Sequence, residues 1–269
     1  MHIIANIPIL LLATMSRESS LSTALPTTTI QIHRKNNHLN PTPKLILLDR
    51  DGVINHDVGS RGVLSPHQFH LTSHAGNAIG RLKRNYACHV AIITNQSCVG
   101  KGLLSLSELD EIHGVMRRKL LEQDECAVID QIYVCTLVEE CDFRKKPNPG
   151  MIMEACNDWG VDDYLGEHSS NDNSKNDDHG DDYSSLIFIG DTLTDLQAAR
   201  RGGIHHRILV QTGYGFGLMG DTSACHPPQL IEKTSLDYIH GSCPELKSVT
   251  PFIYAANLAD AVDWIVGDD

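Results

Sequence analysis

The sequence predicts an α/β fold built on a parallel β-sheet, and two observations support this prediction. Short, continuously apolar runs alternate along the chain with longer segments of helical periodicity, which is typical of successive β-α-β units. Polar residues follow directly after three of the apolar runs. Because ligands bind at the carboxyl ends of the strands in such sheets, these polar residues mark the expected site.

The first predicted elements are two strands and two helices. Residues 44–48 are an apolar run preceded by a proline, which predicts a fully buried strand, and residues 89–94 predict a second one. Residues 74–86 place their apolar side chains on one helical face. Residues 108–123 predict an amphipathic helix that is capped by Ser107.

The remaining elements continue the alternation. Gly160 follows one of the helices, and glycine often ends a helix in the left-handed conformation. Strands are expected at residues 129–135, 185–189, 208–210 and 252–254, and helices at residues 149–159, 194–201 and 258–266.

Three stretches do not fit the alternation. Residues 1–43 begin with a short apolar run and continue rich in Ser, Thr and Asn, so we interpret them as a presequence or a disordered tail. An acidic, low-complexity insertion is expected at about residues 162–184. Residues 214–250 show weak periodicity and are predicted to be a long irregular insertion. The α/β domain is therefore assigned to residues 44–269.

Composition limits the partners and the compartment. The formal net charge is -12, and an acidic surface repels nucleic acid, which we therefore do not expect as a partner. No apolar run reaches the ~18 residues of a membrane-spanning helix, so no membrane association is expected. The 8 cysteines show no repeated spacing, which is typical of free thiols in a reducing intracellular compartment. The sequence makes no prediction of oligomeric state.

Four polar signals lie where the sheet would place a site. Each signal alone is weak, because a lone Asp-x-Asp after a strand is more often a turn or a helix cap. In this order and at these strand ends, they together indicate a catalytic site. The signals are Asp49 and Asp51 after the first strand, Thr94 and Asn95 after the second, Lys146 before the helix at 149–159, and Asp191 and Asp195 after the strand at 185–189.

These residue types suit the transfer of a phosphoryl group. A carboxylate such as Asp49 attacks a negative phosphate only when a divalent cation screens the repulsion, and Mg²⁺ needs few protein ligands, which Asp49 and Asp191 could supply. Asp51 could protonate the leaving group and later deprotonate water. Thr94, Asn95 and Lys146 are the candidates to bind the phosphate, and Thr94 and Lys146 could hold the equatorial oxygens of the transferring group.

The chain resembles the haloacid dehalogenase superfamily in four segments: Asp49-Arg-Asp-Gly-Val-Ile-Asn55, Thr94-Asn-Gln-Ser97, Lys146-Pro-Asn-Pro-Gly150 and Ile189-Gly-Asp-Thr-Leu-Thr-Asp195. The Asp-Arg-Asp-Gly and Thr-Asn-Gln-Ser forms resemble, more narrowly, the branch of the heptose bisphosphate phosphatases and histidinol-phosphate phosphatases. The resemblance implies a Rossmann-like three-layer sandwich with a mostly parallel sheet. It also implies a cytoplasmic enzyme, or an organellar one if residues 1–43 are a targeting presequence.

The resemblance also assigns roles in the site. It implies that Asp49 is the nucleophile and Asp51 the general acid/base. Mg²⁺ would be bound by Asp49, the backbone carbonyl of Asp51 and Asp191, with Asp195 supporting these ligands. The spacing between Asp51, Thr94 and Lys146 leaves room for about one strand-helix unit in each gap, so we expect no separate cap domain.

One departure from the family concerns zinc. Members of the branch often carry a loop of one His and three Cys that binds zinc just before the Lys-Pro motif. Here Cys135 and Cys141 are the two candidates in that stretch, with no His between them. Two thiolates do not complete a tetrahedral site, so structural zinc is not expected.

The resemblance implies that the substrate is a small phosphorylated metabolite, for which D-glycero-D-manno-heptose 1,7-bisphosphate, hydrolysed at its 7-phosphate, is preferred. A second phosphate requires cations near the mouth of the site, and the candidates are Arg61, Lys101, Arg144 and Lys145.

Other readings stay open at this point. One alternative substrate is histidinol phosphate, whose positive amine would prefer carboxylates such as Glu139 or Glu140. Another is a different sugar phosphate. A polynucleotide 3′-phosphatase is disfavoured by the acidic balance. A catalytically inactive binding module is disfavoured because Asp49, Asp51 and Asp191 are all present.

Overall fold

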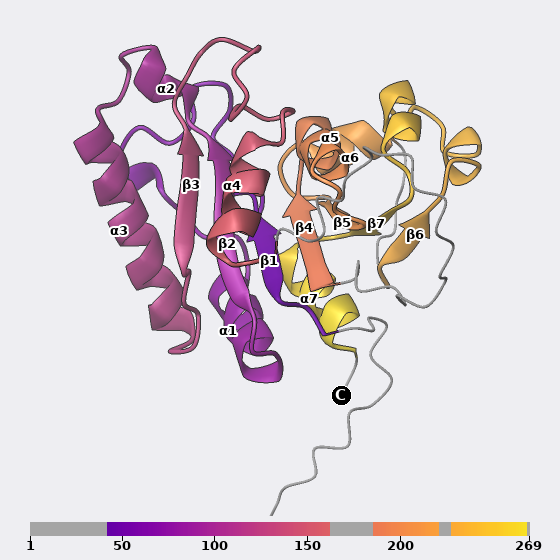
Figure 1. Ribbon diagram of the computed structural model, residues 1–269, viewed down its shortest axis with the longest axis horizontal. Coiled ribbons are helices and arrows are strands. Elements are labelled where there is room, and N and C mark those ends of the chain that lie inside the picture. The colour runs from indigo at the N-terminus through magenta and orange to yellow at the C-terminus, as the bar shows by residue number, and fades with distance from the viewer. Residues whose placement is uncertain (1–41, 162–184, 221–226, 268–269) are drawn as a thin grey trace, which may run out of the picture. The chain divides into compact units, whose positions relative to one another are not determined.

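The computed structural model describes residues 42–161, 185–220 and 227–267. Within these residues the strands form one sheet in the order β3-β2-β1-β4-β5-β7-β6 (Figure 1). All neighbouring strands pair in parallel except β6, which runs antiparallel to β7. The predicted mostly parallel sheet is therefore confirmed. The strands are β1 (Leu45–Leu48), β2 (His89–Asn95), β3 (Gln131–Cys135), β4 (Leu186–Gly190), β5 (His206–Val210), β6 (Gln229–Ile231) and β7 (Phe252–Ala255).

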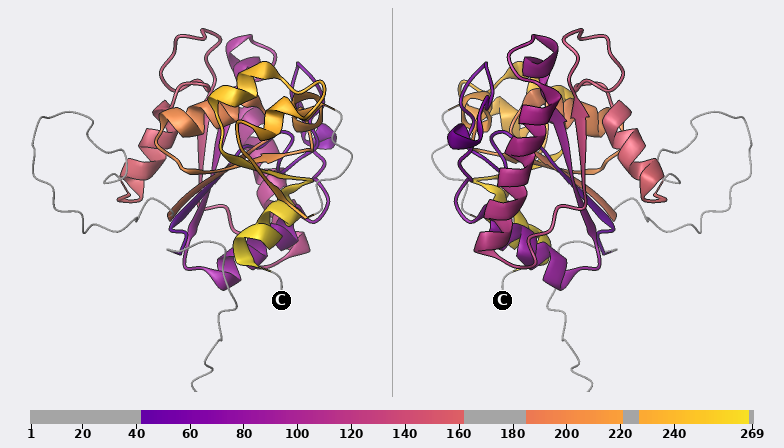
Figure 2. Two further views of the ribbon diagram at one scale, coloured as in Figure 1. Left: turned by 90° about the vertical axis from the view of Figure 1, so that its right-hand side faces the viewer. Right: turned by 90° about the vertical axis from the view of Figure 1, so that its left-hand side faces the viewer.

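Helices cover both faces of this sheet (Figure 2). On one face α1 packs against both α3 and α7, and buried side chains from all three join one hydrophobic cluster with the strands. On the other face α4 and α5 contribute to a second cluster. The helices are α1 (Ala75–Asn85), α2 (Ser97–Gly100), α3 (Leu106–Gln123), α4 (Gly150–Asp158), α5 (Leu193–Arg201), α6 (Gly215–Met219) and α7 (Leu258–Val266).

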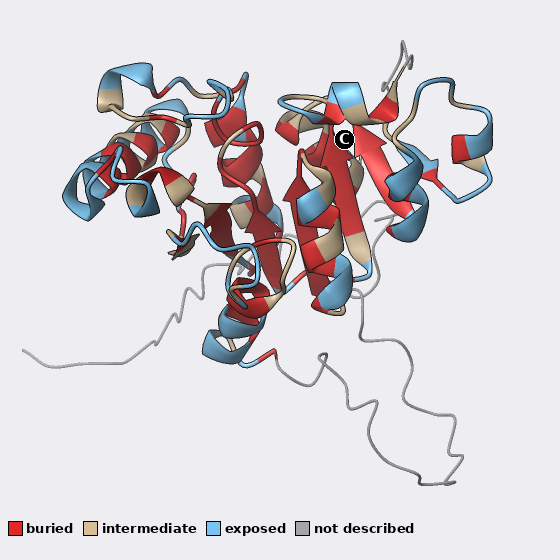
Figure 3. Cartoon of the chain, turned by 90° about the horizontal axis from the view of Figure 1, so that it is seen from above, coloured by how far each residue is buried: buried red, intermediate tan, exposed pale blue. Residues whose placement is uncertain are grey.

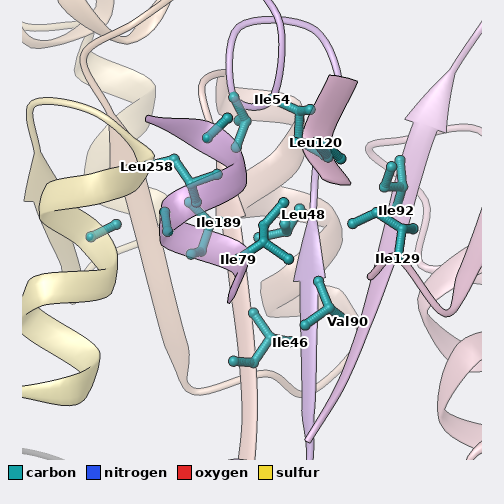
Figure 4. Close-up of a cluster of buried hydrophobic side chains, with 14 of the residues drawn as sticks. Ile46, Leu48, Ile54, Ile79, Val90, Ile92, Leu120, Ile129, Ile189 and Leu258 are labelled. Carbon is teal, nitrogen blue, oxygen red and sulfur yellow. The ribbon is translucent and has the colours of Figure 1, made fainter. Parts of the chain in front are cut away.

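Strand β1 is buried on both faces, as its continuous apolar run predicts. Ile46 and Leu48 point into the first cluster, which Figure 4 shows in close-up. Leu45 and Leu47 point into the second cluster. All four side chains have 0% exposure. The burial-coloured view in Figure 3 shows the same division, with the strands buried and the outer faces of the helices exposed.

The pairing of β1 brings the functional segments together. β1 lies between β2 and β4, with Leu48 opposite Ile92 on one side and Ile189 on the other. The backbone N–H of Asp49 continues the ladder by donating to the Ile189 carbonyl at 2.9 Å. The residues that follow these three strands therefore emerge at one edge of the sheet, as predicted.

The N-terminal cap of α3 differs from the prediction. The helix begins at Leu106, and its cap is Ser105 rather than Ser107. The Ser105 hydroxyl accepts from the Glu108 backbone N–H at 3.2 Å, and the Glu108 carboxylate accepts from the Ser105 N–H at 2.8 Å. This reciprocal capping box requires a spacing of three residues before a glutamate, which Ser107 does not have.

The stretch 214–250, predicted to be a long irregular insertion, contains several short elements in its described residues. They include α6, β6 and 3₁₀ helices at Ser235–Asp237 and Pro244–Ser248. These short elements bury Met219, Ile231 and Leu246 in a third cluster against β5 and β7. Each element contributes few buried residues, so the sequence shows no clear period. The expectations for residues 1–41 and 162–184 lie outside the described residues.

Within the described part of the chain, no helix is both long and apolar enough to cross a membrane.

We predict that Ser105→Ala lowers the free energy of unfolding by ~1 kcal/mol, because the Glu108 backbone N–H in the first turn of α3 loses its acceptor. Urea denaturation would measure the change. Ser107→Ala is the matched control, since Ser107 is exposed inside the helix, and it should change stability by less than ~0.5 kcal/mol. Equal losses in the two variants would contradict the assignment of the cap.

Candidate active site

Three aspartates form a cluster at the carboxyl end of the sheet. Asp49 follows β1, Asp191 follows β4 and Asp195 lies in the first turn of α5. One carboxylate oxygen of each lies within 4.8 Å of the others. All three side chains are buried, with exposed fractions of 8%, 1% and 0%. Such a concentration of buried negative charge is unstable without compensating cations.

The electrostatics of the cluster reflect this crowding. Burial raises the pKa of Asp191 to about 9, and the neighbouring charges of Asp195 and Asp49 add to the effect. Burial also raises the pKa of Asp49 to about 7, although the Lys146 ammonium opposes the shift. Carboxylates perturbed in this way are common where a divalent cation binds.

The surroundings of Asp191 fit a metal ion. Its Oδ1 atom is buried and has no hydrogen-bond partner, whereas Oδ2 accepts from the Tyr214 backbone N–H at 2.9 Å. Two glycines leave the space around the carboxylate open. A Cβ atom would lie 2.2 Å from Asp191 Oδ2 if added to Gly52, and 2.0 Å from it if added to Gly213. Asp49 and Asp191 therefore offer the hard oxygen donors that Mg²⁺ prefers.

Lys146 balances part of the negative charge. Its Nζ atom lies 2.8 Å from Asp49 Oδ1 and 2.6 Å from Asp195 Oδ1, and it donates to the Ile93 carbonyl at 2.8 Å. Burial lowers the pKa of Lys146, but the charges of Asp195 and Asp49 outweigh burial and raise it above the ordinary lysine value. The ammonium therefore stays charged beside the Asp49 carboxylate.

Two predicted site residues turn out to position others. Asp195 Oδ2 accepts from the Thr192 backbone N–H and hydroxyl, so both of its oxygens are engaged, one by Thr192 and one by Lys146. The Asn95 side chain donates to the Lys146 carbonyl at 3.0 Å and accepts from the Lys146 N–H at 3.1 Å. Its amide thus fixes the backbone of Lys146.

Asp51 receives donors on both carboxylate oxygens. Arg50 donates to Oδ1 and Oδ2 at 3.0 and 2.8 Å, Asn55 donates to Oδ1 at 2.9 Å, and Gln96 donates to Oδ2 at 2.9 Å. Burial alone would raise the pKa of Asp51, but the Arg50 charge and these hydrogen bonds hold it below the ordinary value. Sequence reasoning missed the roles of Arg50, Asn55 and Gln96, although all three lie inside the motifs that it quoted.

Two adjoining pockets open above the strand ends. The inner pocket has a volume of about 130 Å³ and the outer pocket about 180 Å³, so each is smaller than a typical drug-sized site and suits a compact polar group. Asp51, Asp57, Asn95 and Tyr214 line both pockets. The inner pocket is also lined by Asp49, Thr94, Lys146, Asp191, Thr192 and Thr194.

The four cations predicted near the mouth divide into two pairs. Arg61 and Lys101 line the outer pocket. Arg144 and Lys145 line neither of the two pockets. Arg144 pairs with Glu154 at 3.0 Å, and Lys145 donates to the Val138 carbonyl. The expectation that these two bind substrate therefore has no support in the structure.

The loop between β3 and α4 is held by side-chain hydrogen bonds. Asn148 donates to the carbonyls of Glu140 and Asp142 at 3.2 and 2.8 Å, and Asp142 Oδ1 accepts from the Arg144 N–H at 2.9 Å.

The two cysteines considered for a zinc site differ in exposure, since Cys135 is buried and Cys141 is exposed. In the described ranges, the only cluster of three potential metal ligands is the aspartate cluster. The expected lack of structural zinc stays a prediction.

Comparisons with known proteins agree with this geometry. A HAD-hydrolase-like family model matches residues 143–229. The D-glycero-beta-D-manno-heptose-1,7-bisphosphate 7-phosphatase of Bordetella bronchiseptica is 34% identical over 174 residues, covering 64% of this chain and 83% of the relative. The enzyme of the same name from Pseudomonas aeruginosa is 33% identical, covering 65% of this chain and 85% of the relative.

A solved structure matches as well. It is the crystal structure of D,D-heptose 1,7-bisphosphate phosphatase from B. bronchiseptica, complexed with magnesium and phosphate. The TM-score is 0.59 at 29% identity, and the match covers 84% of this chain and 99% of the other.

We predict that Mg²⁺ raises the melting temperature by about 5–10 °C at saturating concentration, because a cation relieves the repulsion in the aspartate cluster. Asp191→Asn should raise the melting temperature measured in EDTA, since the amide is neutral without the proton that the buried carboxyl must take up on folding, and should abolish the shift with Mg²⁺. Asp110→Asn, at an exposed position of α3, should keep the shift. A full shift in Asp191→Asn would contradict this metal site.

Proposed function

The chain belongs to the haloacid dehalogenase superfamily of phosphatases, in the branch of the heptose bisphosphate phosphatases, and we propose that it hydrolyses the 7-phosphate of D-glycero-D-manno-heptose 1,7-bisphosphate. The observation that carries the proposal is the convergence of Asp49, Asp191 and Lys146 on one pocket, with Asp51 beside them and a second, cation-bearing pocket adjoining. The inner pocket suits the 7-phosphate, which is hydrolysed, and the outer pocket suits the 1-phosphate, which remains on the sugar.

Asp49 is the proposed nucleophile. Its Oδ1 atom accepts from the Arg50 backbone N–H at 2.7 Å and pairs with Lys146. These two contacts fix the carboxylate and leave Oδ2 as the oxygen that attacks phosphorus. In the first step the new bond joins Asp49 to phosphorus while the bond from phosphorus to the sugar oxygen breaks.

The surrounding groups stabilise the charge of the transferring phosphoryl group. Thr94 and Lys146 line the inner pocket, where a hydroxyl and an ammonium suit the equatorial oxygens. Asp49, Asp191 and the Asp51 backbone carbonyl would hold Mg²⁺. The bound ion would screen the repulsion between the Asp49 carboxylate and the phosphate.

Asp51 is the proposed proton carrier. Arg50, Asn55 and Gln96 keep Asp51 ionised in the free chain, so it would take up a proton from solvent when the substrate binds, and it gives that proton to the leaving sugar oxygen in the first step. In the second step it takes a proton from the water that attacks phosphorus, which releases phosphate and restores Asp49. Asp51 lines both pockets. With one phosphate of the substrate in each pocket, the sugar between them would lie beside Asp51.

The outer pocket supports a bisphosphorylated substrate. Arg61 comes from the segment after β1, and Lys101 follows α2. Both are exposed, and both line the pocket. Two cations from separate segments are suited to a second phosphate at some distance from the reacting one.

Histidinol phosphate is the second candidate substrate. Asp57 lines both pockets, and its carboxylate would attract the amine of that substrate. The carboxylates of Glu139 and Glu140, which the sequence suggested for this task, line neither pocket.

We predict that hydrolysis requires Mg²⁺ and stops in EDTA. Asp51→Asn should lower kcat at least ~10²-fold and Asp49→Asn more, because the first lacks the proton carrier and the second the nucleophile. Phosphate release measures both rates. A rate close to that of the unmodified chain in either variant would mean that the roles are misassigned.

We predict that Arg61→Ala and Lys101→Ala raise KM for the heptose bisphosphate about 10-fold or more and hardly change it for a sugar monophosphate. Arg144→Ala is the matched control, since this side chain lies outside both pockets, and it should change neither KM. Equal effects on the two substrates, or faster turnover of histidinol phosphate than of the bisphosphate, would argue against the substrate.

A further inference from the structure

Arg50 is a buried cation that lies beside the proposed site without lining either pocket. Its side chain is 0% exposed and is among the largest fully buried side chains in the described part of the chain. Its Nη2 atom donates to both Asp51 oxygens, at 3.0 and 2.8 Å. Burying a guanidinium is unfavourable unless its hydrogen bonds are well made. A smaller apolar residue would fill the core without that cost.

His113 completes the environment of this guanidinium. Nη1 of Arg50 lies 3.3 Å from Nε2 of His113, on the buried face of α3. The His113 ring is 7% exposed. Burial, together with the nearby Arg50 charge, lowers the pKa of His113 to about 4. The ring is therefore neutral near pH 7, and its Nε2 accepts the hydrogen bond.

The planar shape of the guanidinium makes this contact directional. The hydrogen bond to His113 fixes the rotation of the Arg50 plane, and that plane fixes the direction of the two bonds to Asp51. Asn55 and Gln96 then bind one oxygen each. The Asp51 carboxylate is thereby held in a single orientation at the junction of the two pockets.

We propose that Arg50, oriented by His113, is a positioning residue that aims the Asp51 carboxylate at the oxygen of the leaving group. The inference rests on the proposed function, because it assigns a task to the proposed proton carrier. It goes beyond that function by giving α3, which supplies none of the proposed catalytic residues, a direct effect on catalysis.

The test uses two substrates that differ in their need for a proton. A sugar phosphate releases an alkoxide, which must be protonated as the bond breaks. 4-Nitrophenyl phosphate releases a stable phenolate, which needs no proton. A residue that positions the proton carrier affects the first substrate much more than the second, whereas a residue that only stabilises the fold affects both equally.

Three variants of the full chain carry the test. Arg50→Met should lower kcat/KM for the sugar phosphate at least ~10²-fold and for 4-nitrophenyl phosphate less than ~10-fold. His113→Leu should show the same pattern at about 10-fold. His113→Gln, whose amide oxygen accepts the Arg50 bond, should recover most of that loss. Glu111→Gln, at an exposed position of α3, is the control.

Melting temperature and its shift with Mg²⁺ show whether each variant keeps its fold and metal site. If Arg50→Met does not fold, the comparison of His113→Leu with His113→Gln tests the positioning role by itself. Equal losses for both substrates, or a loss in His113→Gln as large as in His113→Leu, would overturn the inference while leaving the phosphatase intact. A wild-type chain with no Mg²⁺-dependent hydrolysis of either substrate would overturn the proposed function, and this inference with it.

Discussion

The ion pairs of Lys146 with Asp49 and Asp195 are the interaction on which the site depends. The ammonium lies at 2.8 and 2.6 Å from the two carboxylates in a buried setting, where an unpaired charge would be costly. The fold supplies its position in two ways. The Ile93 carbonyl at the end of β2 accepts from Nζ, and the Asn95 amide binds the Lys146 backbone. The order of β2, β1 and β4 in the sheet places all these groups at one edge.

Charge balance connects this interaction to the rest of the site. Four carboxylates converge there, from Asp49, Asp51, Asp191 and Asp195, and among the described residues only Lys146 and Arg50 are buried near them as cations. The remaining two negative charges match one divalent cation. The raised pKa values of Asp49 and Asp191 have the same origin, since burial and mutual repulsion outweigh the charge of Lys146, which Asp49 shares with Asp195. The pKa of Asp51 is lowered instead, because the charge of Arg50 lies beside its carboxylate.

The sequence predicted those parts of the site that depend on strand ends. Asp49, Thr94 and Asp191 follow continuous apolar runs, and parallel pairing necessarily brings such positions together. His113 could not be predicted, because on the sequence it is one residue on the apolar face of an amphipathic helix. Its contact with Arg50 spans 63 positions and depends on how α3 packs. Arg144 and Lys145 were placed by their proximity to Lys146 in the sequence, but neighbours in a turn point in different directions.

The central claim is that phosphate passes through the Asp49 carboxylate, and trapping the phosphorylated enzyme tests it most directly. A single turnover with enzyme in excess would be quenched with acid at serial times and treated with borohydride, which reduces an acyl phosphate to an alcohol. Mass spectrometry of the peptides then locates the reduced side chain. The structure predicts reduction at Asp49, whose carboxylate is fixed by Lys146 and the Arg50 N–H. Reduction at Asp51 or Asp191 instead, or at no residue at any time, would contradict the account.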